Sequence, residues 1–152
     1  MSLADAAGYL LGFDVGTKMI GVAIGHPLTG TARALATIKV AHGKADWNVL
    51  DVLVREWQPV AMVIGLPLAL DGSEQEMTGV ARTFGKRIAA RYAVPVHESD
   101  ERFTSKEAAR RFASQRAQGT AKRKHGADID ALAAQIILES WLALPGNSGT
   151  ST

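Results

Sequence analysis

The feature that most constrains the fold is a pair of short apolar runs, at residues 9–13 and 20–24, separated by only a few residues. Strands joined by so short a connection must pair antiparallel, because a parallel crossover needs a dozen or more residues. Asp14 follows the first run and precedes a turn at 16–18, and open α/β sheets collect ligands at such carboxyl ends of strands. An ordinary turn aspartate that accepts backbone N–H bonds would occupy the same position, so both interpretations stay open.

The rest of the chain alternates between strand and helix patterns. β-Branched residues predict a strand over 34–40, and further runs predict strands at 60–64 and 94–98. Helical spacing predicts helices after the third, fourth and fifth strands, the last of them with apolar residues through Leu144 on its buried side. The order predicts an α/β fold, with a mixed sheet of about five strands and helices on both faces. The expected residues at the helix starts are Asp46, Ser73 with Glu76, Thr104 with Glu107, and Asp128 as N-cap.

Length and composition set further limits. The chain has 152 residues, which fits one domain over 1–144, and we expect the small polar residues 145–152 to form a flexible tail. The absence of cysteine excludes disulfide scaffolds, Cys-ligated metal sites and Cys nucleophiles. The sequence has no run of about 20 apolar residues, which a membrane-spanning helix would need. Residues 1–11 also lack the basic region of a secretory signal peptide. We therefore expect a cytoplasmic protein with no membrane partner.

The net charge of +2 hides an uneven distribution. Residues 102–125 carry eight basic side chains and one acid, so this cationic segment has a charge of +7, while the remaining residues sum to −5. Such asymmetry indicates a polyanionic partner such as nucleic acid, although a solvated helix face and loop would look the same. The basic residues of the segment are Arg102, Lys106, Arg110, Arg111, Arg116, Lys122, Arg123 and Lys124.

Acidic residues recur at two later positions where a crevice is expected. Asp100 and Glu101 follow the strand at 94–98, and only one of two adjacent residues on an extended chain faces a given side. Asp130 falls in the first turn of the last predicted helix. Carboxylates suit Mg²⁺ or Mn²⁺, and two such ions about 4 Å apart stabilise both the attacking and the leaving oxygen of a phosphodiester. The four histidines show no zinc-ligand spacing.

Five stretches in order resemble one family. Residues 13–18 leading into 20–23 are similar to the opening signature of the YqgF (RuvX) family, and the resemblance extends over about residues 11–142. The later stretches that match are 30–33, 63–67, 100–105 and 130–140. This resemblance implies a ribonuclease H-like fold and a nuclease. The family is associated with maturation of the 5′ end of pre-16S ribosomal RNA, and it has also been proposed to contain Holliday-junction resolvases by analogy with RuvC.

The resemblance also implies roles for particular residues. Asp14, Glu101 and Asp130 would be the catalytic acids and the ligands of one or two Mg²⁺ or Mn²⁺ ions, with Asp100 as the alternate for Glu101. Many ribonuclease H-like enzymes have an acid at the end of the fourth strand. This chain departs from that pattern, because residues 65–67 at that point are Gly-Leu-Pro and include no carboxylate. The nucleic-acid contacts that we predict are Thr17, Lys18, Arg102, Lys106, Arg110, Arg111, Lys122, Arg123 and Lys124.

Other functions fit parts of the same pattern. An actin-like ATPase or sugar kinase opens with a similar Asp-x-Gly-Thr hairpin, but its site lies between two such lobes and this chain has room for one. A non-catalytic RNA-binding factor in ribosome assembly would need only the cationic segment. We expect a nucleic-acid partner, either a ribosomal RNA precursor or structured DNA, and an association with the ribosome would follow from the first. The sequence leaves the choice between RNA and a DNA junction, and the oligomeric state, open.

Overall fold

The computed structural model describes residues 8–101 and 126–145. In these ranges a sheet is formed by β1 (Leu10–Val15), β2 (Met19–His26), β3 (Thr31–Ala41), β4 (Lys44–Ala45), β5 (Ala61–Leu66) and β6 (Val96–Asp100). Its order is β4-β3-β2-β1-β5-β6. The first four strands pair antiparallel, whereas β5 and β6 join β1 in parallel. The mixed α/β sheet expected from the pattern is therefore confirmed, with the two-residue β4 as an additional strand at one edge.

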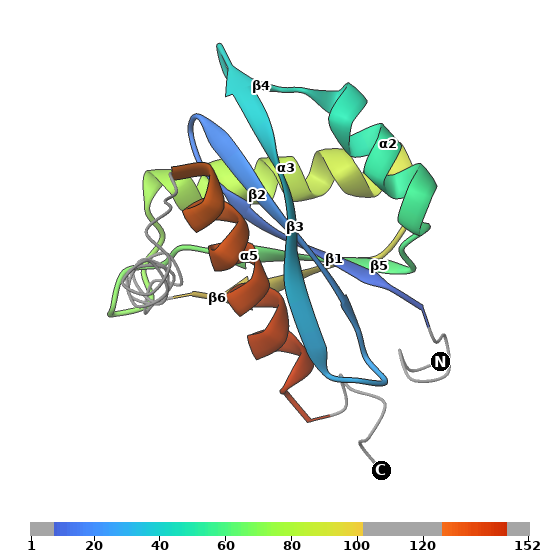
Figure 1. Cartoon of the computed structure of the whole chain (residues 1–152). Helices are drawn as coiled ribbons and strands as arrows, with labels where there is room; N and C mark the ends of the chain where they lie inside the picture. The colour runs from blue at the N-terminus through green and yellow to red at the C-terminus, as the bar shows by residue number, and fades with distance from the viewer. Residues whose placement is uncertain (1–7, 102–125, 146–152) are drawn as a thin grey trace, which may run out of the picture.

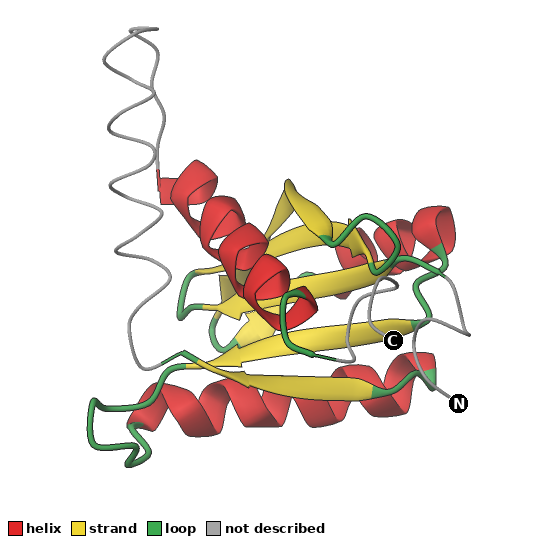
Figure 2. Cartoon of the chain, turned by 90° about the horizontal axis from the view of Figure 1, so that it is seen from below, coloured by secondary structure: helices red, strands yellow, loops and turns green. Residues whose placement is uncertain are grey.

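Within residues 8–101 and 126–145, three helices cover the two faces of this sheet. The helix α5 (Gly126–Leu142) crosses one face, whereas α2 (Trp47–Trp57) and α3 (Glu76–Tyr92) cover the other (Figure 1). The view turned by 90° shows the strands as a layer between α5 and α3 (Figure 2). None of the helices in the described ranges has the combination of length and hydropathy that a membrane span needs.

The side chains of β1 show how the two faces are separated. Leu11 and Phe13 belong to the core under α2 and α3, whereas Leu10 belongs to the core under α5. Because successive side chains on a strand point to opposite faces, the even-numbered residues of β1 face α5. Asp14 is one of those residues, and this places it on the α5 face.

Two helix starts differ from the sequence-based expectation. The Ser73–Glu76 capping box is wrong, because α3 begins at Glu76 and its N-cap is Gln75, whose backbone N–H donates to Thr78 Oγ1 at 3.0 Å. The Ser73 N–H instead donates to Asp71 Oδ1 at 2.9 Å, so this residue belongs to the preceding turn. By contrast, Asp46 is the N-cap of α2, as its spacing predicts, and it accepts a bond from the Asn48 N–H at 3.2 Å.

The last helix also differs at both ends. The chain is already helical at Gly126, so Asp128 lies within the helix and is not the N-cap. Carboxylates are favoured at helix N-termini, which is why the sequence pattern indicated a start at Asp128. Leu144 lies beyond the end of α5 and is 51% exposed, because the helix ends at Leu142, so its assignment to the buried side is wrong. The Thr104–Glu107 helix start and the tail after residue 145 lie outside the described residues.

Candidate active site

Asp14 is held on the α5 face by the hairpin that the sequence predicts. It is the penultimate residue of β1 and pairs with Gly21 of β2. The turn after β1 is closed by a bond from the Gly16 N–H to the Met19 carbonyl at 2.9 Å. The Asp14 side chain is half-buried and its Oδ2 atom is fully covered. The rigid antiparallel ladder therefore fixes this carboxylate at the carboxyl end of a central strand.

Asp130 approaches the same place from the first half of α5. Gly21, the partner of Asp14 in the sheet, lies against the main chain of this helix. A Cβ built on Gly21 would lie 1.9 Å from the Asp130 carbonyl oxygen and 2.9 Å from the Ala131 nitrogen, a separation that no side chain tolerates. Glycine at this position thus allows the helix to pack directly on the strand. This contact places the main chain of Asp130 beside the Asp14–Gly21 pair of the sheet.

Glu101 reaches the α5 face from the end of β6. Its backbone N–H donates to the Leu66 carbonyl at 2.9 Å, which extends the parallel β5–β6 ladder by one residue. Its Oε2 atom accepts a bond from Ser99 Oγ at 2.8 Å. Gly65 of β5 leaves the space for this side chain, because a Cβ there would be 3.2 Å from Glu101 Cγ. Ser99 and Gly65 therefore orient a carboxylate that the strand alone would leave free to rotate.

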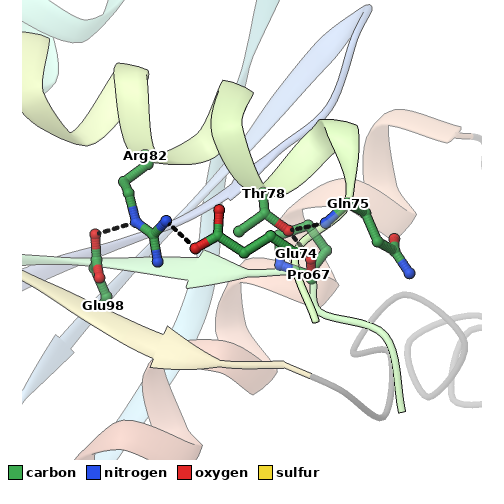
Figure 3. A network of polar contacts seen from close by, with 6 residues as sticks. All are labelled: Pro67, Glu74, Gln75, Thr78, Arg82 and Glu98. Atoms are coloured by element: carbon green, nitrogen blue, oxygen red, sulfur yellow. Dashed lines mark hydrogen bonds and ion pairs between the residues drawn. The ribbon is translucent and has the colours of Figure 1, made fainter. Parts of the chain in front are cut away.

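Asp100 lies on the other face of the sheet. Glu98, two residues earlier in β6, accepts a bond at 3.3 Å from Arg82 of α3, so this side of the strand faces α3 (Figure 3). The period of two on a strand gives Asp100 the same direction, and its side chain is exposed. Arg82 also binds Glu74, and this hydrogen bond raises the pKa of the guanidinium. The structure therefore separates the two adjacent acids by the thickness of the sheet.

The three acids on the α5 face are a chemically suitable donor set for Mg²⁺ or Mn²⁺, since hard divalent cations take carboxylate oxygens. Their convergence is incomplete. Among residues 8–101 and 126–145, no three His, Asp or Glu side chains are close enough together to hold an ion.

The predicted nucleic-acid contacts divide into two groups. Thr17 and Lys18 are exposed in the turn after β1, close in sequence to Asp14. The remaining predicted contacts lie outside the described residues, so the structure gives no position for Arg102, Lys106, Arg110, Arg111, Lys122, Arg123 or Lys124. In the sequence, the cationic segment follows Glu101 directly and is followed by α5, which contains Asp130.

A cavity of about 440 Å³ opens on the other side of the sheet. It lies between β3, β4 and α3, and its lining includes Val15, Val40 and Phe84. Val15 follows Asp14 in β1 and points to the opposite face, into the core under α2 and α3. The cavity is therefore separated from the three acids and is not part of this candidate site.

Sequence reasoning missed the residues that bring the acids together. Gly21 and Gly65 were not selected, although each makes a close approach that a side chain would prevent. Ser99 was missed as well, although its spacing of two from Glu101 on a strand is a usable signal for a shared face. The contacts of the glycines join segments far apart in the chain, and no local pattern reports them.

Comparison with known proteins agrees with the fold and the motifs. The chain matches the RuvX family, described as Holliday junction resolvase, over residues 8–144. A relative from Xylella fastidiosa (strain M23) named "Putative pre-16S rRNA nuclease" is 50% identical over 139 residues, covering 91% of this chain and 89% of the relative. One of the same name from Azotobacter vinelandii is 47% identical over 135 residues, covering 88% and 92%.

Solved structures extend the likeness to the fold. Thermus thermophilus RuvC in complex with a Holliday junction substrate has a TM-score of 0.54 at 19% identity, covering 89% of this chain and 93% of that one. A second Thermus thermophilus RuvC structure has a TM-score of 0.51 at 18% identity, covering 88% and 93%. At these identities the likeness concerns the fold, which is ribonuclease H-like as the motifs imply. From the match over residues 8–144 and the identity to its relatives, the chain belongs to the RuvX family.

Proposed function

We propose that this protein is a divalent-metal-dependent nuclease that hydrolyses phosphodiester bonds in the 5′ region of the 16S ribosomal RNA precursor. The name shared by relatives up to 50% identical supports the substrate, and family membership supports the reaction class. The observation that supports the proposal is that Asp14, Glu101 and Asp130 come from different elements and lie on one face of the sheet. Asp14 and Glu101 lie at the carboxyl ends of β1 and β6, and Asp130 lies on α5 where this helix packs against Gly21.

In this proposal a specific contact of the fold fixes the position of each acid. Asp14 is held by the β1–β2 ladder, Asp130 by the close packing of α5 on Gly21, and Glu101 by the hydroxyl of Ser99. These carboxylates would hold one or two Mg²⁺ or Mn²⁺ ions. When bound, such ions lower the pKa of a water molecule and stabilise charge on phosphate oxygens. The chain itself supplies the fixed negative charge and orients the site, and the absence of cysteine suits direct hydrolysis without a covalent intermediate.

The cationic segment would hold the substrate next to these acids. It follows Glu101 directly and has a charge of +7 over residues 102–125. Lysine and arginine bind phosphates without reading the sequence, and their contribution falls steeply with salt concentration. Arg102 follows Glu101 directly in the sequence, and in this proposal it binds the phosphate nearest the acids. Binding to a precursor RNA would also bring the protein to the assembling ribosome.

A DNA four-way junction is the alternative substrate. The description of the family and the fold shared with RuvC favour it. Symmetric cleavage of a junction requires two active sites related by a two-fold axis, so this function predicts a dimer. A non-catalytic RNA-binding factor is a third candidate, and it predicts binding that does not depend on metal or on Asp14.

One assay separates these functions. Purified protein and the Asp14→Asn variant are incubated with a labelled 5′-extended 16S precursor fragment and with a synthetic four-way junction, in Mg²⁺, Mn²⁺ or EDTA. The proposal predicts metal-dependent cleavage of the RNA that is lost in Asp14→Asn while RNA binding is kept. Paired symmetric nicks in the junction without RNA cleavage would contradict it in favour of a resolvase. Binding without cleavage of either substrate would favour the assembly factor.

A further inference from the structure

A second group of cationic side chains lies on the body of the protein, apart from the cationic segment. Residues 15–45 contain Lys18, Arg33, Lys39 and Lys44 and no Asp or Glu. All residues outside 102–125 together, with 15–45 included, have a net charge of −5, so the residues other than these two stretches are acidic. Residues 15–45, which form the first strands and their hairpins, therefore have a net positive charge within a part of the chain that is acidic as a whole.

The fold brings the three lysines among these residues to the tips of the two hairpins. The Val40 N–H donates to the Lys18 carbonyl at 2.9 Å, and Lys39 pairs with Met19 at the end of β2. Lys44 begins β4, which turns back on the end of β3. Figure 1 shows the β1–β2 turn and β4 at the same end of the sheet. All three side chains are exposed, so their ammonium groups share one solvent-facing region.

Lys18, Lys39 and Lys44 form a lysine patch in which no ion pair with a carboxylate is found among residues 8–101 and 126–145. The salt bridges between described residues involve Arg82 and Arg91, each with acids on or near the helices. The three lysines form none within those same residues. Like charges held close together repel, and an anionic partner that neutralises them relieves this cost. The patch is thus suited to a polyanion and unsuited to an apolar or cationic partner.

The patch lies on the side of Asp14 away from β6. Asp14 pairs with Gly21, and Gly21 pairs with Thr37 of β3. Lys39 is two residues beyond Thr37, so it lies on the α5 face, as the acids do. Two strand spacings and two residue rises place its Cα about 12 Å from that of Asp14. The cationic segment instead follows β6, at the opposite edge of the sheet.

We propose that the lysine patch binds phosphates of the nucleic-acid strand beyond the cleavage point, on the hairpin side of the acids. This inference rests on the proposed nuclease function and adds a surface to it. A strand crossing the carboxyl ends of β6, β5 and β1 reaches the hairpin tips next.

The test measures the salt dependence of binding to a single-stranded RNA fragment of the 16S precursor, in EDTA so that no cleavage occurs. Fluorescence anisotropy is recorded for the wild type, for Lys18→Gln/Lys39→Gln/Lys44→Gln, and for Arg55→Gln/Lys86→Gln/Arg87→Gln. The second triple variant removes the same charge from exposed positions on α2 and α3. Circular dichroism and thermal unfolding establish that both variants are folded.

We expect the slope of log K against log salt to fall by about 2 in the lysine variant, since each phosphate contact on a single strand contributes about 0.7. Between about 50 and 200 mM salt its affinity would then fall about 20-fold less than that of the wild type. The control triple should keep the wild-type slope. Equal slopes for the two triples, or no binding by the wild type, would overturn the inference. Cleavage of the same RNA by the wild type in Mg²⁺ is scored separately, so a failure of the nuclease function is distinguishable.

Discussion

Replacing Gly21 with alanine is the sharpest test of how the acids are brought together. The new Cβ would lie 1.9 Å from the Asp130 carbonyl oxygen and 2.3 Å from its carbonyl carbon. Ordinary contact at this position begins at 3.4 Å, so the helix and the strand must separate by about 1.5 Å. The obstructing atoms belong to the backbone of α5, which cannot rotate away as a flexible side chain can.

Two consequences follow for the Gly21→Ala variant. Overpacking a well-packed interior costs about 1–3 kcal/mol, and we expect the upper end because backbone must move. A loss of about 3 kcal/mol lowers the melting temperature by about 6–12 °C in a protein of this size. Displacing Asp130 relative to Asp14 should also reduce cleavage, since a misplacement of about 1 Å costs about 100-fold in rate.

The assays are urea unfolding and single-turnover RNA cleavage, performed below the unfolding transition of the variant. Gly79→Ala is the matched control, because a Cβ there has nothing within 4 Å and alanine is the better helix former. This control should be as stable as the wild type or more stable by up to about 1 kcal/mol, with unchanged cleavage. Wild-type stability and activity in Gly21→Ala would refute the reasoning, since the close approach of α5 would then not be required.

Three further predictions concern the same face of the sheet. In Gly65→Ala the new Cβ would lie 2.5 Å from Ile137 Cδ1 and 3.2 Å from Glu101 Cγ. Adding Ile137→Val should restore stability in urea unfolding but should not restore cleavage. Restored cleavage would show that the contact with Glu101 is unimportant. Ser99→Ala removes the bond to Glu101 and should lower cleavage and apparent Mg²⁺ affinity by about 10–100-fold with little loss of stability; an unchanged metal titration would contradict a role in positioning Glu101. Burial lowers the pKa of His97 below its ordinary value of about 6.5. As the pH falls, His97 is therefore protonated in the unfolded state at a higher pH than in the folded state. The free energy of unfolding should decrease as the pH falls below about 6.5. His97→Phe should flatten this dependence in denaturant melts at about pH 7.5 and 5.5, and an identical slope in the variant would assign it to other groups.

Much of the fold follows from local sequence rules. The short connection after Asp14 forces the antiparallel β1–β2 hairpin, and the helical spacing with Asp46 as cap predicts α2 to its observed bounds. Alternation of strands and helices then predicts the parallel addition of β5 and β6. β4 could not be predicted in this way, because a strand of two residues exists only through its pairing with β3.

Errors appear at helix starts, where several residues compete to cap. Ser73 followed by Glu76 satisfies the capping-box pattern, yet Thr78 accepts from the Gln75 N–H and also donates to the Pro67 carbonyl (Figure 3). This second bond joins the helix start to the end of β5, and it outweighs the local pattern. Tertiary contacts of this kind cannot be read from the spacing of two residues.

The candidate site was predictable in its residue types but not in its geometry. Motif resemblance selected Asp14, Glu101 and Asp130, whereas strand alternation alone left Asp100 and Glu101 open. The register of β6 and the bond from Arg82 to Glu98 place Asp100 on the α3 face. Register depends on pairing between distant segments, so the structure was needed to separate the two acids.

The most direct test of the central claim compares the two adjacent acids in one cleavage assay. Single-turnover rates on the 5′-extended 16S precursor fragment are measured in Mg²⁺ for Glu101→Gln and Asp100→Asn. The account predicts that Glu101→Gln loses more than the roughly 10–100-fold expected for a supporting residue, because it removes a proposed metal ligand from the α5 face. Asp100→Asn, on the exposed α3 face, should cleave at nearly the wild-type rate. Loss of cleavage in Asp100→Asn with Glu101→Gln still active would contradict the account.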